Sequence, residues 1–154
     1  MNQQDWLDLL PMEPSGRFHL SKKPIQAVTK VAQEMSLKPK GIWYGIGDSW
    51  REWAASEIPY VACRYTHLYR LELGGTIAKL STSEAVDDFT AKYSFGDDWP
   101  WIAWEKVEKD FDGIEVFPYN HRDRFRYTWY YGLDAASGCV WNPDAVKIHL
   151  VSKV

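Results

Sequence analysis

The chain has 154 residues, enough for one domain with a single hydrophobic core. A net charge of −3 and a pI near 5.8 argue against a broad basic face for nucleic acid, although a local basic run lies at His121–Arg126. Cys63 and Cys139 match no metal-ligand spacing, so we expect two buried free thiols in a reducing cytoplasm. We also expect no signal peptide and no membrane contact, because no segment approaches the roughly 18 apolar residues of a membrane span.

Aromatic residues make up 16% of the chain and include nine Trp. Trp offers a large stacking surface with one hydrogen-bond donor. This surplus predicts either a core filled with rings or a cleft that stacks a planar ligand, and for any single Trp the core is the simpler interpretation.

The N-terminal part of the chain predicts an arm over residues 1–15, followed by one domain over residues 16–154. Residues 16–21 predict a short strand. Pro24 followed by apolar residues at helical spacing predicts a helix over 24–35. The apolar, glycine-bounded stretch 41–47 predicts a second strand.

The middle of the chain begins with Ser49–Glu52, a capping-box pattern that predicts a helix start. Alternating apolar residues predict a long strand over 61–73. Gly74–Gly75 predicts a hairpin turn into a returning strand at 76–80. Ser81–Glu84 then predicts the cap of another helix.

The last third predicts a helix from residues 96–101 to about residue 110, then strands near 113–119, 138–141 and 146–151. Short strands alternate with a few helices, without regular βαβ spacing. This favours the α+β class, with a mostly antiparallel β-sheet and flanking helices. The long aromatic stretch 118–138 predicts a substrate-recognition insert or a lid.

Four segments together resemble the ADP-ribosyltransferase family, and the resemblance covers most of residues 17–150. They are "RFHLSKKPI", "KGIWYGIGDSWREWA", "DFDGIEVFPY" and "GCVWNPDAVK". The resemblance implies a split β-sheet with NAD bound in the cleft between its two halves. It also implies transfer of ADP-ribose to a macromolecular acceptor, for which a protein is expected rather than a nucleic acid.

One branch of that family uses a His on the first strand, a Tyr on the second and a Glu on a later strand. By this match the catalytic roles fall on His19, Tyr44 and Glu115. The residues expected to contact NAD are His19, Leu20, Ser21, Tyr44 and Gly45. A carboxylate beside the ribose stabilises the positive charge that develops as the nicotinamide–ribose bond breaks. Tyr44 is expected to stack on nicotinamide, and His19 with Ser21 to bond the adenosine-side ribose.

Alternatives remain open at this stage. Another branch uses an Arg, a "S-T-S" strand end and a Glu, which here would be Arg70, Ser81–Ser83 and Glu115. Position 113 is Gly, so the paired "E-x-E" of arginine-modifying relatives is absent. A catalytically inactive module that grips a nucleotide or a partner protein, and so inhibits a host system, is the second functional interpretation. The resemblance further implies an effector of phages or mobile elements, acting in the host cytoplasm.

Overall fold

The structure is a computed structural model that describes residues 13–94 and 101–153. Most of the predicted arm, and the start of the helix predicted from residue 96, lie outside the described residues. Among those residues, seven strands form one hydrogen-bonded sheet in the order β5-β7-β8-β3-β1-β4-β9. In that order they are β5 (Ile77–Leu80), β7 (Gly113–Val116), β8 (Ser137–Val140), β3 (Ile42–Ile46), β1 (Arg17–Ser21), β4 (His67–Leu73) and β9 (Val146–Lys153).

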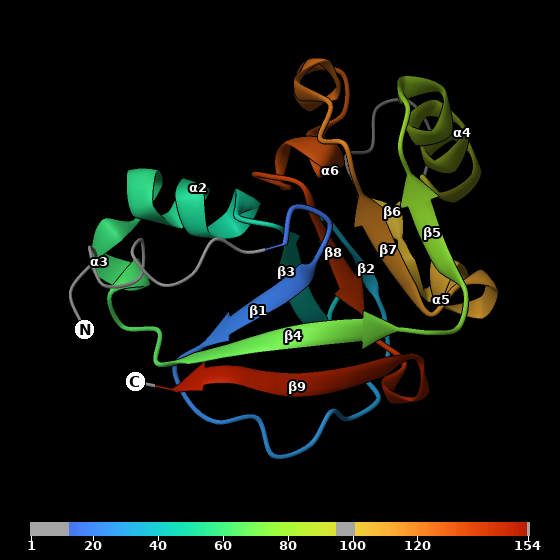
Figure 1. The fold of residues 1–154 in the computed structure, drawn as a ribbon. Coiled ribbons are helices and arrows are strands. Elements are labelled where there is room, and N and C mark those ends of the chain that lie inside the picture. The colour runs from blue at the N-terminus through green and yellow to red at the C-terminus, as the bar shows by residue number, and fades with distance from the viewer. Residues whose placement is uncertain (1–12, 95–100, 154) are drawn as a thin grey trace.

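The sheet is mostly antiparallel, and the only parallel neighbours among the described strands are β5 and β7. The predicted combination of a mostly antiparallel sheet with a few helices is thereby confirmed. The sheet is strongly twisted, as expected from the right-handed twist of strands. In Figure 1 the arrows of β4 and β9 run across the view, whereas those of β5 and β7 run up it.

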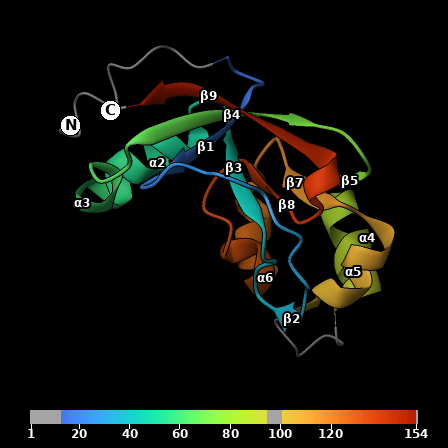
Figure 2. The same cartoon turned by 90° about the horizontal axis from the view of Figure 1, so that it is seen from below.

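Helices cover the two ends of the sheet separately. In Figure 2, α4 (Ser83–Tyr93) and α5 (Trp104–Asp110) lie beside β5 and β7, while α2 (Ser49–Glu57) and α3 (Pro59–Ala62) lie at the β1 and β4 end. Between them is α6 (Thr128–Tyr131), preceded by the 3-10 helix η1 (His121–Phe125). A second 3-10 helix, η2 (Pro143–Ala145), leads into β9, and β2 (Met35–Ser36) pairs with β6 (Ile102–Ala103) away from the main sheet.

The core beneath α4, α5 and α6 is built largely from rings. Trp104, Trp129, Tyr130 and Trp141 are all buried, and Trp104 makes edge contacts with both Trp129 and Trp141. Each of the three Trp rings donates its N–H to a hydrogen bond, which removes the cost of burying that polar group. For these Trp residues the core interpretation is confirmed.

The helix predicted over 24–35 is wrong. Residues 24–34 have no regular secondary structure and cross one face of the sheet, where Ile25 and Val28 pack against the cluster around Tyr69. The Ile25 N–H donates to the Tyr69 hydroxyl at 2.8 Å, which ties the start of this segment to β4 of the sheet. An extended chain covers about 3.3 Å per residue against 1.5 Å for a helix, so an extended strap spans this face and a helix of the same length would not.

The predicted strand over 61–73 is only half right, because Pro59 opens α3 and regular pairing starts at His67. The hairpin predicted at Gly74–Gly75 is wrong. Both edges of β4 are already occupied, by β1 and by β9, so β5 pairs with β7 instead.

The capping box predicted at Ser49 is also wrong. The Ser49 hydroxyl donates to the Ala136 carbonyl at 2.6 Å and accepts from the Ile46 N–H, so it joins β3 to the segment before β8. The cap predicted at Ser81–Glu84 is confirmed, since Thr82 accepts from the Ala85 N–H at the start of α4. Both cysteines are free, but Cys63 is partly exposed and only Cys139 is buried.

Gly138 on β8 is required by close packing. An added Cβ would overlap the Tyr44 ring and hydroxyl and would lie 2.7 Å from the Ile114 carbonyl oxygen. We therefore expect Gly138→Ala to lower the free energy of unfolding by about 1–3 kcal/mol, as overpacking typically does. Gly74→Ala is the matched control because no atom lies within 4 Å of its added Cβ. Denaturant unfolding followed by circular dichroism measures both variants, and equal effects would contradict this packing argument.

Candidate functional site between the diverging strands

The candidate site lies where β1 and β3 separate. These neighbours share two register pairs, Arg17 with Ile46 and Phe18 with Gly45, whereas β1 and β4 remain paired along five positions. Beyond Phe18 the two strands diverge and open a cavity of about 270 Å³. It is lined by residues of both strands, of α2 and of the segment before β8: Phe18, His19, Leu20, Lys38, Trp43, Tyr44, Gly45, Trp50, Tyr65, Gly132, Leu133, Asp134, Ala135 and Ser137.

The cavity wall is mainly apolar and aromatic. Trp43 and Trp50 contribute partly buried rings, and the Trp50 ring stacks on Trp53 with centroids 4.9 Å apart. Gly45 brings α2 close to β3, because an added Cβ there would lie 2.6 Å from the Trp50 Cβ. Lys38 lies 5.9 Å from the Trp43 ring centroid, which places a cation at the aromatic wall.

His19 joins the two strands at the point of divergence. Its Nδ1–H donates to the Trp43 carbonyl, which fixes the ring across the gap. Burial lowers the pKa of His19 and outweighs the opposing effect of that bond, so the imidazole is neutral near pH 7. In this tautomer Nε2 is an acceptor, and no described residue bonds it.

The Glu115 side chain on β7 is buried, and its carboxylate is bonded by side chains from β1 and β3. Its carboxylate accepts from Arg17 Nε at 2.6 Å and from Arg17 Nη2 at 3.3 Å. It also accepts from the Tyr44 hydroxyl at 2.9 Å. The hydrogen bond that Arg17 donates to Glu115 raises the pKa of Arg17, while burial, reinforced by the Glu115 charge, raises the pKa of Tyr44. Arg17 is thus a cation and Tyr44 a neutral donor at neutral pH.

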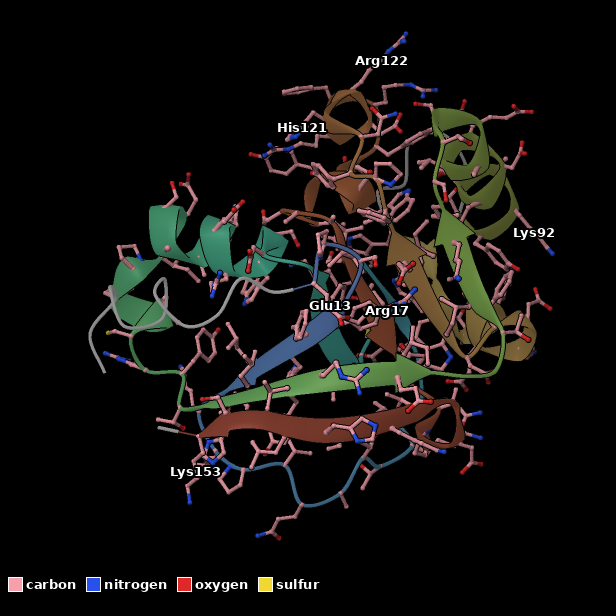
Figure 3. The ribbon with its side chains drawn as sticks, viewed as in Figure 1. Glu13, Arg17, Lys92, His121, Arg122 and Lys153 are labelled. Carbon is pink, nitrogen blue, oxygen red and sulfur yellow. The ribbon has the colours of Figure 1, made fainter. Side chains whose placement is uncertain are left out.

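The register of the sheet explains how these side chains meet. Gly138 is paired with Tyr44 on one side and with Glu115 on the other, so the three positions share one face. Because Gly138 has no side chain, the Tyr44 ring passes over it and reaches the carboxylate. Arg17 approaches from β1 at the centre of the molecule (Figure 3) and also borders a second, more open cavity of about 380 Å³ next to Thr76 and Lys79.

The structure brings some of the predicted residues together and separates others. His19, Leu20, Tyr44 and Gly45 all line the cavity. Ser21 does not, and its hydroxyl instead donates to the Lys23 carbonyl. Glu115 is 5% exposed and reaches the cavity wall only through Tyr44.

One predicted role is corrected. Tyr44 is 3% exposed and directs its hydroxyl to Glu115, so its ring faces are not free for stacking on nicotinamide. Trp43, expected in the core, lines the cavity together with Trp50. Phe18 and Tyr65 contribute further rings to the same cavity wall. In the alternative alignment Arg70 is exposed on β4 and Thr82 is a helix cap, so neither lines the cavity.

Sequence reasoning missed Arg17, Lys38 and Trp50 as residues of this site. Arg17 stands two residues before His19 on the same strand, a spacing that places both side chains on one face and that could have identified it. Lys38 comes from a connection whose position depends on tertiary packing, and no local pattern marked it. Residues 132–135, which line the cavity, belong to the stretch 118–138 that the sequence singled out as a substrate-recognition insert or a lid.

Comparison with protein-family models, with curated proteins and with solved structures found no match to this chain. Among the described residues, no helix has the length and apolar character to cross a membrane. No cluster of three or more His, Cys, Asp or Glu side chains suited to a metal ion occurs in residues 13–94 and 101–153.

The bond between Tyr44 and Glu115 yields a stability prediction. Tyr44→Phe removes a hydrogen bond to a charged group, worth about 1.5–3 kcal/mol, while Arg17 still pairs with the carboxylate. We expect the free energy of unfolding to fall by that amount in denaturant titrations. Tyr60→Phe serves as control because Tyr60 is 68% exposed, and a similar loss there would argue against the interpretation.

The lowered pKa of His19 predicts a pH dependence. The folded chain binds this proton less readily than the unfolded chain, whose His titrates near 6.5. The stability linked to His19 is therefore complete above pH 6.5 and is lost as the pH falls below it. Thermal unfolding between pH 8 and pH 5 should show a smaller acid-side loss for His19→Gln than for the unsubstituted chain, and parallel losses would contradict the assignment.

Proposed function

We propose that the chain is an ADP-ribosyltransferase-like domain that binds NAD in the cavity between β1 and β3. One observation carries the proposal. The predicted NAD contacts His19, Leu20, Tyr44 and Gly45 line a single cavity, and the hydroxyl of Tyr44 bonds the predicted catalytic carboxylate at 2.9 Å.

The cavity chemistry suits parts of a dinucleotide. Trp43 and Trp50 offer aromatic faces for a planar base, since base–aromatic stacking needs little else from the protein. His19 presents Nε2 as an acceptor for a ribose hydroxyl. Lys38 provides a cation for the pyrophosphate.

The size of the cavity limits how NAD fits. Ligand pockets range from about 300 to 1,000 Å³, and this cavity of about 270 Å³ falls just below that range. We therefore infer that it holds one half of the dinucleotide, while the other half extends along the open side formed by residues 132–135.

The proposed transfer gives Glu115 the central role. As the nicotinamide–ribose bond breaks, positive charge develops on the sugar, and a nearby carboxylate stabilises it. Tyr44 orients the carboxylate through its hydroxyl. Arg17 bonds both oxygens of Glu115, so in the proposed transfer the carboxylate exchanges part of this pairing for contact with the sugar.

A nucleotide-binding module without transfer is the second candidate, and one observation favours it. Glu115 is 5% exposed, bonds Arg17 through both oxygens and does not line the cavity. In that case the chain would bind a nucleotide or a partner protein in the host cytoplasm. It would inhibit a host system by binding alone, without catalysing a reaction.

Nicotinamide release from NAD by the purified chain tests the proposal. We expect release in the unsubstituted protein and a loss of about 10²-fold or more in Glu115→Gln, by analogy with the removal of one charge-stabilising group. Glu84→Gln is the matched control, since Glu84 is exposed on the first turn of α4. Unfolding curves exclude loss of fold as the cause.

The same samples separate the two candidates. Quenching of Trp fluorescence by NAD with no nicotinamide released would favour the binding module. Neither quenching nor release would reject NAD as the ligand of this cavity.

A further inference from the structure

A second surface lies beside the cavity, on η1 and α6, and no role has yet been assigned to it. Phe125 is 85% exposed, and Tyr131 on α6 is also exposed. Arg122 and Arg124 precede Phe125 on η1, and the guanidinium of Arg124 lies 5.2 Å from the centre of the Tyr131 ring. We call Arg122, Arg124, Phe125 and Tyr131 the arginine–aromatic surface.

The turn that carries this surface is firmly anchored. Asp123 is fully buried and accepts from the Ser83 hydroxyl at 3.1 Å and from Arg126 Nη1 at 2.8 Å. Asn120 donates to the same Ser83 hydroxyl, which ties η1 to the start of α4. Phe125 therefore projects from an ordered turn.

The spacing within η1 places charge beside the exposed ring. A 3-10 helix has three residues per turn, so Arg122 and Phe125 lie above one another on one side. Figure 3 shows His121 and Arg122 pointing outward from this turn. The charge of Arg126, in contrast, is taken up by Asp87 and Asp123.

We propose that the arginine–aromatic surface binds a short segment of single-stranded nucleic acid. Bases stack on exposed aromatic rings and on guanidinium planes, while arginines contact the phosphates. The exposed large apolar residues of 113–135 are Phe117, Phe125 and Tyr131, and each of them offers a ring face on which a base can stack. A duplex fits poorly because its bases are already stacked and paired with one another, which leaves none free to stack on Phe125 or Tyr131.

The position of the surface connects it to the cavity. Tyr131 immediately precedes Gly132, which together with Leu133 and Asp134 lines the cavity. If the transfer proposed above holds, a strand bound here lies next to the NAD site as an acceptor. The binding itself does not depend on that transfer.

Fluorescence polarisation of a labelled oligothymidylate about ten nucleotides long, within the range of about 4–16 covered by stacking grooves, tests the proposal. We expect binding at low salt by the unsubstituted chain and weaker binding of the matching duplex. Phe125→Ala and Phe125→Leu should both weaken binding about tenfold, because Leu keeps apolar volume but has no ring face. Arg122→Ala should reduce the slope of log affinity against log salt by about 0.7, the value for one single-strand phosphate contact.

The matched controls are Tyr60→Ala, which removes another exposed ring, and Arg70→Ala, which removes another exposed arginine. Both should bind as the unsubstituted chain does. Absence of binding by the folded chain would overturn the proposal and leave a protein as the partner of this surface. Unchanged affinity in Phe125→Leu would also overturn it, since an apolar contact rather than stacking would then be involved. Oligonucleotide binding by an unsubstituted chain that releases no nicotinamide from NAD would reject the proposed transfer and leave this binding proposal standing.

Discussion

The carboxylate of Glu115 connects three strands that come from distant parts of the chain. It lies on β7, is paired with Arg17 of β1, and accepts a hydrogen bond from Tyr44 of β3. A buried carboxylate is costly unless its charge and its lone pairs are matched, and here a guanidinium and a phenol supply both. The arrangement requires a residue without a side chain at position 138, so the sequence of β8 is constrained by a contact between its two neighbours.

This cross-strand network also explains where the cavity is. Arg17 and Ile46 are paired beside the network, and the strands β1 and β3 separate two residues later. The bonds among Glu115, Arg17 and Tyr44 thus join the strands on one side of the point where β1 and β3 separate. On the other side, His19 links these two strands through its bond to the Trp43 carbonyl. A ligand in the cavity would contact the same two strands that position the carboxylate.

Much of the fold could be predicted from local sequence, but the pairing of strands could not. The strand at Arg17–Ser21, the strand at Ile42–Ile46 and the cap at Thr82 follow from short-range patterns. Residues 24–34 are predicted as a helix because their apolar residues recur at helical spacing. In the structure this segment is irregular, and its backbone donates a hydrogen bond to the sheet. For the site, the order His19, Tyr44, Glu115 was visible in the sequence. The pairing of Arg17 with Glu115 spans 98 positions, and only the folded sheet reveals it.

The anchoring of η1 has a consequence for how this protein can change over time. Asn120, Asp123 and Ser83 fix the turn from within, whereas the side chains of Arg122 and Phe125 are exposed and carry no part of that attachment. Outward-pointing side chains on such an anchored turn can be substituted with little change in the free energy of unfolding. The same holds for most surface substitutions away from packed features. The chemical character of this exposed surface can therefore change while the bonds that hold η1 and the sheet stay the same.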